Sequence, residues 1–280
     1  MEIDKPLLKS LLMMADIIEA RDPYTGGHVW RVSQFAKLLA TKLGLPRDEI
    51  IKISIAAYLH DLGKVGIPDH ILQKAEALTD AEYAIVKTHP SIGSKLLGGH
   101  PLAEMVSAAA KEHHERLDGT GYPNGLRGDQ LSLTARIVSI ADAFDAMTST
   151  RSYRKGMPME QALDRLQESA GSHFDPVLVA HLCELGSADD LTHIVGHTAE
   201  GIPTVTCPHC GPVIAIPRHT KDGDIIYCRA CHGQLELHRA GDTFEAKMTG
   251  MTDDPRNLEP RANKDAVDDI LVQISERLNF

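Results

Sequence analysis

The stretch YLHDLGKVGIP, from Tyr58 to Pro68, places a histidine and an aspartate side by side, His60-Asp61, with Lys64 three residues further on. Because neighbouring helix positions point about 100° apart, the imidazole and the carboxylate reach a common metal only across the shoulder of a helix end. A histidine paired with a neighbouring carboxylate is also a common structural arrangement. The rest of the chain therefore decides what this pair means.

Further nitrogen and oxygen ligands are spread over the first half of the chain. Together with the first pair they form a set of seven side chains: His28, His60, Asp61, His89, His113, His114 and Asp142. The set contains no thiolate, which suits iron, manganese or zinc in a hydrolytic site better than a closed structural zinc site. These residues therefore indicate a metal-dependent hydrolytic centre.

Four motifs carry a family resemblance. HDLGK, THP, HHERLDGTGYP and ADAFDAMTSTRSYR occur in the order and spacing of the HD-GYP domain, the bacterial branch of the HD phosphohydrolase superfamily, which the chain resembles over roughly residues 6 to 185. The resemblance implies a mainly α fold, an HD-type helical bundle. It also implies hydrolysis of cyclic di-GMP or a related cyclic dinucleotide, with linear pGpG as the product and GMP in some members.

The resemblance also implies how the metals are held. Two divalent metals are expected, iron or manganese in preference to zinc, with Asp61 as the bridging carboxylate. Some relatives carry a glutamate four residues before the first histidine for a third metal, and that position is Tyr24 here. A hydroxide bridging two metals about 3.5 to 4 Å apart would attack the phosphodiester. The remaining ligands divide into one set of His28, His60 and Asp142 and another of His89, His113 and His114.

Substrate contacts are expected on three segments. Lys64 would neutralise a phosphate oxygen as charge develops, so Asp61 and Lys64 are the predicted catalytic pair. A glycine-rich loop is usually a flexible connector, but beside the histidine doublet it would bring backbone close to a nucleotide and offer the Tyr122 ring for base stacking. Basic residues at a helix end are usually solvated, but here they resemble a phosphate clamp. The predicted substrate-binding residues are Lys64, Gly121, Tyr122, Pro123, Arg151 and Arg154.

Helical periodicity places these side chains near helix ends. Apolar spacing predicts helices over residues 6–20, 28–44, 46–60, 133–147, 158–170 and 176–186, and a further helix from Pro101 to His113. Thr79 to Glu82 has the pattern of a capping box, and the helix that it starts is expected to end before Pro90, with His89 at its C-terminal edge. A structural cap is the alternative role for His89, and Asp145 is either a surface carboxylate or a partner of a ligand.

Composition excludes some functions. The chain has 280 residues and a net charge of −10, which argues against a nucleic-acid-binding surface, because such surfaces need clustered lysine and arginine. It contains no apolar run long enough to span a membrane and no signal-peptide pattern. A cytoplasmic protein without membrane contact is therefore expected.

Four of the five cysteines form two CxxC units, Cys207 with Cys210 and Cys228 with Cys231, separated by 17 residues. Both spacings are typical of a zinc ribbon with one structural zinc. The strands Val213–Ile216 and Asp224–Tyr227 are expected to pair as a hairpin around the turn at 221–223. Residues 205–248 hold equal numbers of basic and acidic side chains, which favours a structural or protein-contact role over nucleic-acid binding.

The expected domain plan has four parts. These are the phosphohydrolase domain (1–186), a linker (187–204), the zinc ribbon (205–248), and a second linker with a C-terminal amphipathic helix (249–280). That helix is patterned by Val267, Ile270, Leu271, Ile274 and Leu278. Because it would be marginal alone, it is expected to dock on the ribbon, on the helical domain or on a second subunit. The ribbon and this helix are the candidate surface for a protein partner or for dimerisation.

Two alternatives to a cyclic di-GMP phosphodiesterase stay open. One is a phosphohydrolase of another cyclic dinucleotide or nucleotide, because HD metal sites are shared by several hydrolases. The other is a non-catalytic scaffold that responds to a cyclic dinucleotide. A scaffold would be expected to have lost ligands, and the sequence keeps all of them.

Overall fold

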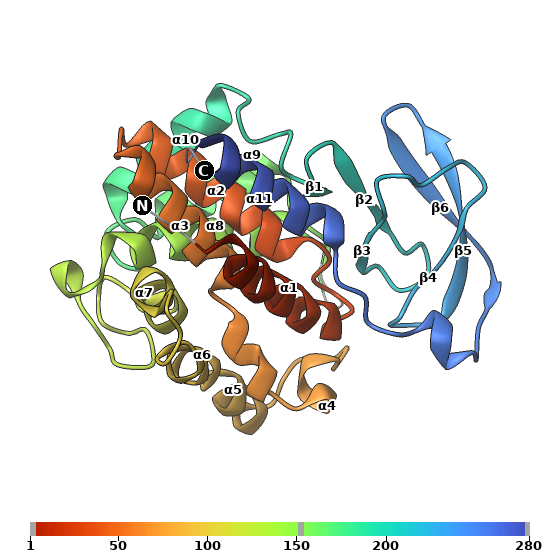
Figure 1. Ribbon diagram of the computed structural model, residues 1–280, viewed down its shortest axis with the longest axis horizontal. Coiled ribbons are helices and arrows are strands. Elements are labelled where there is room, and N and C mark those ends of the chain that lie inside the picture. The colour runs from red at the N-terminus through yellow and green to blue at the C-terminus, as the bar shows by residue number, and fades with distance from the viewer. Residues whose placement is uncertain (1–3, 151–153, 278–280) are drawn as a thin grey trace.

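The computed structural model describes residues 4–150 and 154–277. Helices form one body, and two small antiparallel sheets lie beside it at the C-terminal side of the chain (Figure 1). The predicted fold class, a mainly helical HD bundle with a small β module and a C-terminal helix, is confirmed. No helix in the described ranges is long and apolar enough to cross a bilayer.

The centre of the bundle is built by α2 (His28–Lys42), α3 (Arg47–Leu59) and α8 (Leu133–Thr148), which contact one another. Val32, Phe35 and Leu39 follow helical spacing along α2 and are completely buried. Phe35 meets Phe144 of α8 edge to face, with ring centroids 4.9 Å apart. This rigid core fixes the helix ends from which the predicted ligands project.

The remaining helices of the bundle surround this core. They are α1 (Lys5–Arg21), η1 (Leu62–Gly66), α4 (Asp69–Leu72), α5 (Asp80–Val86), α6 (His89–Leu97), α7 (Ala103–Glu112), η2 (Gly128–Gln130), α9 (Met159–Glu168) and α10 (Pro176–Ser187). The capping box at the start of α5 is present, with Thr79 and Glu82 bonded reciprocally. The helix predicted from Pro101 begins two residues later, at Ala103.

The predicted place of His89 was wrong. The helix that Thr79 caps already ends at Val86, and His89 is the first residue of the next helix, α6. Pro90 lies in the first turn of α6, where a proline is tolerated because the amide of that position needs no intrahelical partner. The proline therefore starts a helix here instead of ending one.

The two sheets have the orders β1-β2-β3 and β4-β5-β6, and every pairing is antiparallel. Their strands are β1 (His197–Ala199), β2 (Ile202–Thr206), β3 (Val213–Ala215), β4 (Ile225–Tyr227), β5 (Gly233–Ala240) and β6 (Thr243–Met251). The expected hairpin between β3 and β4 was wrong, because β3 pairs with β2 and β4 pairs with β5. Each CxxC unit forms the turn of its own hairpin, and the turn at 221–223 only connects the two hairpins.

The segment 187–204 differs from the linker that was expected. It contains β1 and the start of β2, and Leu191 and Ile194 within it are completely buried in the main core. The same core extends to Val205 of β2 and Leu237 of β5. The sheet module, defined here as residues 197–251, is thus packed continuously onto the helical bundle.

The C-terminal helix α11 (Lys264–Arg277) docks on the helical bundle against α1, one of the three positions considered from the sequence. It follows the short helix η3 (Pro255–Asn257). Val267 and Ile270 are buried in the main core, and Leu278 of the predicted apolar pattern lies outside the described residues. Figure 1 shows α11 lying across the bundle beside α1.

Ile270→Ala should destabilise the fold, since Ile270 is 1% exposed and the truncation removes buried methyl groups and leaves a cavity. The expected loss is about 2 to 5 kcal/mol of unfolding free energy, measured by urea denaturation followed by circular dichroism. Val272→Ala is the control, because Val272 on the same helix is 53% exposed. Equal effects of the two substitutions would contradict the docking of α11.

Candidate functional site

Helix ends bring the predicted nitrogen and oxygen ligands together. His28 and His89 begin α2 and α6, His60 and His113 cap the ends of α3 and α7, and Asp142 lies within α8. Their ligand atoms fall into groups whose members lie within 4.8 Å of one another. The groups are His28 with His60 and Asp142, His60 with Asp61 and His113, and His89 with His113 and His114.

Three imidazoles are oriented by the backbone of the preceding turn. The Nδ1 atoms of His60, His89 and His113 lie 2.6, 2.8 and 2.8 Å from the carbonyl oxygens of Ala57, Val86 and Ala109. Because a carbonyl oxygen only accepts, each Nδ1 carries the proton and each Nε2 presents a lone pair. These three rings are therefore fixed in the tautomer that binds a metal through Nε2.

The Nε2 lone pairs of these buried rings face one another at distances that favour a cation between them. The Nε2 atoms of His89 and His113 are 3.1 Å apart, and the buried Nε2 of His60 makes no hydrogen bond. Two acceptor nitrogens repel at such a distance unless a positive charge lies between them. Metal–nitrogen bonds are about 2.0 to 2.1 Å long, so two imidazoles that bind one ion at a right angle have nitrogens about 3 Å apart. The donor set thus fits a divalent metal.

Burial keeps His89, His113 and His114 in the neutral form that can bind a metal. Desolvation lowers the pKa of His89, lowers that of His113 well below its ordinary value, and lowers that of His114 to about 3. The positive charge that neighbouring histidines would carry adds to this effect for His113. At neutral pH a proton therefore does not compete with a metal for the lone pairs of these rings.

Asp61 lies between two ligand groups, the first made of His28, His60 and Asp142 and the second of His89, His113 and His114. Its Oδ1 is 3.3 Å from His89 Nε2, whereas its Oδ2 is 3.3 Å from His60 Nε2 and 3.5 Å from His28 Nε2. Lys64 Nζ donates to Oδ2 at 2.6 Å. Burial alone would raise the pKa of Asp61, but Lys64 and His60 outweigh it and hold that pKa well below its ordinary value. One ionised carboxylate therefore faces both groups, as a bridging ligand must.

His28 is held by a carboxylate from another helix. Its Nδ1 lies 2.7 Å from Oδ2 of Asp145, a completely buried residue of α8 whose Oδ1 accepts from Arg31 Nε at 2.5 Å. Burial lowers the pKa of His28, but the hydrogen bonds to Asp145 and Asp61 outweigh it and raise that pKa to about 9. Asp145 is thus a partner of a ligand and not a surface carboxylate. Sequence reasoning missed Arg31, whose only signal was its position one helical turn after His28.

The loop after the doublet is held by a residue that sequence reasoning also missed. Glu115 is buried and accepts from the backbone N–H groups of Asn124 at 2.6 Å and Leu126 at 3.0 Å. At Gly121 a side chain has no room, since a Cβ would come within 2.5 Å of Glu115 Cα and Arg116 N. Glu115 immediately follows the doublet in the sequence, which was the available signal. The bond from Tyr122 to Pro123 in this loop is cis.

The Tyr122 ring has one of its two faces covered. It stacks on His114, with ring centroids 4.8 Å apart and planes inclined by 28°. Lys87 Nζ lies 5.5 Å from the Tyr122 ring centroid. One ring face is therefore packed against a ligand, so the stacking of a base on that face is excluded in this conformation.

The predicted arginine clamp is only partly described. Arg151 lies outside the described residues. Arg154 is half-buried and donates from Nη2 to the carbonyl oxygen of Ala146 on α8, while its buried Nε makes no hydrogen bond. Part of the Arg154 guanidinium therefore holds the chain that follows α8.

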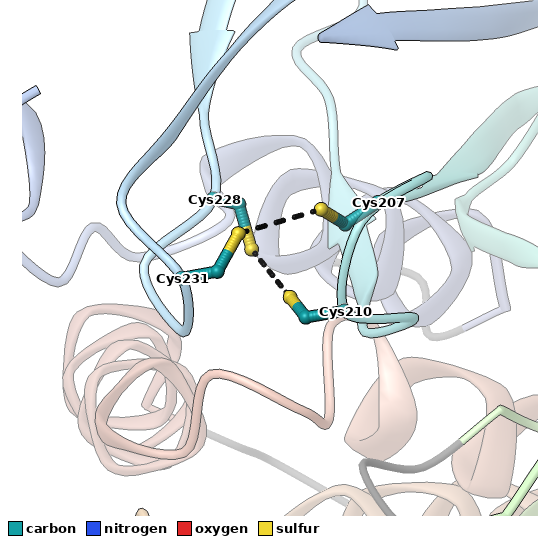
Figure 2. Close-up of side chains that lie close together, drawn as sticks. All are labelled: Cys207, Cys210, Cys228 and Cys231. Carbon is teal, nitrogen blue, oxygen red and sulfur yellow. Dashed lines mark hydrogen bonds between the residues drawn. The ribbon is translucent and has the colours of Figure 1, made fainter. Parts of the chain in front are cut away.

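The four cysteines of the sheet module converge from two hairpins (Figure 2). Cys207 and Cys231 have sulfurs 3.7 Å apart, and those of Cys210 and Cys228 are 3.5 Å apart. These separations are far longer than a disulfide bond of about 2.05 Å and match the edges of a tetrahedron with metal–sulfur bonds of about 2.3 Å. The cluster is therefore consistent with a zinc-binding module.

The helical bundle matches a known protein family. A family described as the HD domain matches residues 12–178. This chain belongs to the HD domain family. The four motifs and the GYP loop place it in the HD-GYP branch, as the resemblance in sequence indicated. The matched range ends within α10, so the sheet module and α11 lie beyond it.

Curated relatives match the same part of this HD domain protein. It is 42% identical over 177 residues to the cyclic di-GMP phosphodiesterase response regulator RpfG of Xanthomonas campestris, covering 62% of this chain and 47% of the relative. Identity to a 3'3'-cGAMP-specific phosphodiesterase of Vibrio cholerae is 41% over 185 residues, with 65% and 35% covered. A cyclic di-GMP phosphodiesterase of Thermotoga maritima is 36% identical over 186 residues, with 66% and 50% covered. The match thus spans half or less of the length of each relative.

Asp145→Asn should weaken metal binding at the histidine centre, because the amide no longer gives His28 a charged partner and no longer neutralises Arg31. Replacing such partners of a ligand typically costs about 10- to 100-fold in metal affinity. The measurement is a titration with Mn²⁺ followed by electron paramagnetic resonance. Asp164→Asn, at an exposed position on α9, is the control. Equal affinity in both variants would show that Asp145 does not support the centre.

Cys231→Ser should abolish zinc binding by the sheet module, because three thiolates and a hydroxyl do not complete the closed tetrahedral site. Metal analysis of purified protein should find a single tightly bound zinc in the parent and none in the variant. The unfolding temperature should fall, since structural zinc contributes to folding. Cys183→Ser is the matched control, because Cys183 lies on α10 away from the cluster. Retained zinc in Cys231→Ser would contradict the site.

Proposed function

We propose that this protein is a metal-dependent phosphodiesterase that hydrolyses cyclic di-GMP to pGpG. The observation that carries the proposal is the set of imidazole lone pairs that converge around Asp61, whose two oxygens face the two ligand groups. The relatives named as cyclic di-GMP phosphodiesterases support this substrate class. A scaffold without activity is disfavoured because the complete ligand set is retained and brought together.

Two divalent metals, iron or manganese, would be held by the seven ligands, and one zinc by the four cysteines. His28, His60 and Asp142 would hold one metal, His89, His113 and His114 the other, and Asp61 would contact both. When bound, such a pair supplies Lewis acidity that lowers the pKa of water and offsets charge on phosphate. Carboxylate and imidazole ligands suit iron and manganese, whereas the thiolates select zinc.

The residues of the chain would orient the reaction. Lys64 donates to Asp61 Oδ2 and would lie beside a non-bridging phosphate oxygen, where its positive charge offsets the negative charge that develops. Tyr122, packed on His114, would form a wall beside the second ligand group. The backbone of the loop, held by Glu115, would fix the position of this wall relative to the bound dinucleotide.

The hybrid dinucleotide 3'3'-cGAMP is the second candidate substrate. A relative specific for it is 41% identical, against 42% for the cyclic di-GMP phosphodiesterase RpfG. Identity therefore does not separate the two substrates. The cytoplasmic location and the contact with a protein partner through the sheet module both stay predictions.

Turnover of cyclic di-GMP and of 3'3'-cGAMP, with Mn²⁺ or Fe²⁺ supplied, tests the proposal. Asp61→Ala and His60→Ala should lower kcat by at least about 1,000-fold, since each removes a metal ligand. His193→Ala, at an exposed histidine outside the centre, should leave turnover unchanged. Faster hydrolysis of the hybrid dinucleotide would favour the second candidate. Binding of both dinucleotides without hydrolysis by the parent would support the scaffold and reject the enzyme.

A further inference from the structure

His28 differs from the other oriented histidines in how it is held. His60, His89 and His113 are fixed by carbonyl groups three or four residues earlier in the chain. His28 instead begins α2 directly after the loop from Asp22 to Gly27, and its Nδ1 partner is Asp145, 117 residues away. The position of this ligand therefore depends on long-range contacts.

The loop before His28 lies directly against the sheet module. A Cβ on Gly26 would come within 2.9 Å of Val213 O and 3.1 Å of Ala215 N on β3. A Cβ on Gly27 would meet Thr198 Cα of β1 at 2.8 Å, and Gly27 also has a positive φ of 77°. Backbone packs on backbone here, so a shift of the sheet module moves the start of α2.

Arg31 connects the loop and the sheet module to the histidine centre. Its guanidinium is 2% exposed, and Nη1 donates to the carbonyl oxygens of Gly26 at 2.8 Å and of His197 on β1 at 2.9 Å. The same guanidinium donates to Asp145, the partner of His28. One buried side chain thus joins the sheet module, the loop and the carboxylate that orients a metal ligand.

The cysteine cluster is anchored to the same region. Arg229, between Cys228 and Cys231, donates from Nη1 to the carbonyl oxygen of Ala20 near the end of α1 and from Nε to that of Leu258 at 2.9 Å. Tyr24 of the loop is buried close to Cys210 and Cys228. In Figure 2 the faint red N-terminal chain passes beside the cluster.

We propose that the sheet module, which holds the four cysteines, positions His28. Zinc bound by these cysteines would thereby raise the affinity of the histidine centre for its divalent metal. Arg229 and Arg31 are positioning residues in this scheme: the first fixes the module to the end of α1, and the second fixes the loop to Asp145. The contacts supplied by the module lie beyond the range matched by the family, so this support is added to the family's bundle. Because coupling between two sites is reciprocal, metal in the histidine centre also tightens zinc binding.

Arg229→Met tests the coupling while leaving every thiolate in place. The variant should retain its zinc by metal analysis, but its affinity for Mn²⁺, followed by electron paramagnetic resonance, should fall by about fivefold or more. Mn²⁺ is a suitable probe because it prefers the oxygen and nitrogen ligands over the thiolates. Arg229→Lys should recover part of the affinity, since lysine keeps a donor for the carbonyl oxygen of Ala20. Arg239→Met is the matched control, because Arg239 lies on β5 of the same module and its guanidinium stacks on Phe244.

The reciprocal measurement uses the parent protein. Zinc release to a chromogenic chelator should be slower with Mn²⁺ in the histidine centre than without it, and this difference should shrink in Arg229→Met. The proposal is rejected if Arg229→Met keeps its zinc and binds Mn²⁺ as the parent does, or if Arg239→Met loses as much affinity. If Arg229→Met fails to fold or loses its zinc, the measurement on the parent protein is used instead. An equal rate of zinc release with and without Mn²⁺ would then reject the coupling. None of these readouts depends on which dinucleotide is cleaved.

Discussion

The hydrogen bonds on Nδ1 of the buried histidines constrain the rest of the centre. Once a backbone carbonyl fixes the proton on Nδ1 of His60, His89 and His113, their lone pairs must point inward. A cluster of inward lone pairs is unfavourable in a buried site unless a cation or a hydrogen-bond donor satisfies it. The backbone geometry of the bundle therefore favours metal binding even without a substrate.

Helix ends are well suited to this arrangement. The last carbonyl groups of a helix can accept from side chains, and a histidine at or just beyond the end uses one of them to orient its ring. His60 and His113 use this device at the ends of α3 and α7, and His89 uses a carbonyl of α5 while it begins α6. The buried contacts among α2, α3 and α8 then set the distances between the helix ends. Packing in the core thus determines the distances between the candidate ligands.

Much of this arrangement could be predicted from the sequence, because ligand type, motif spacing and helical periodicity are local signals. The seven candidate ligands, the cysteine cluster and the capping box at Thr79 are of this kind. Strand pairing in the sheet module was mispredicted, because β3 has a turn on either side in the sequence and pairs with β2 across the turn that holds the first CxxC unit. The packing of Tyr122 on His114 and the role of Arg31 depend on residues brought together by the fold. No pattern within one segment reports such contacts.

Arg31 illustrates why the long-range contacts matter for charge as well as for position. A free Asp145 carboxylate would favour the protonated form of His28, and an imidazolium has no lone pair for a metal. Arg31 offsets that charge with two hydrogen bonds, so Asp145 still orients His28 but holds its proton less strongly. An imidazole that binds a metal through Nε2 must give up any proton on that atom, and a cation beside its carboxylate partner lowers the free energy needed to do so. The guanidinium is kept in place by the carbonyl of His197 on β1, and the electrostatics of the first ligand group therefore extend into the sheet module.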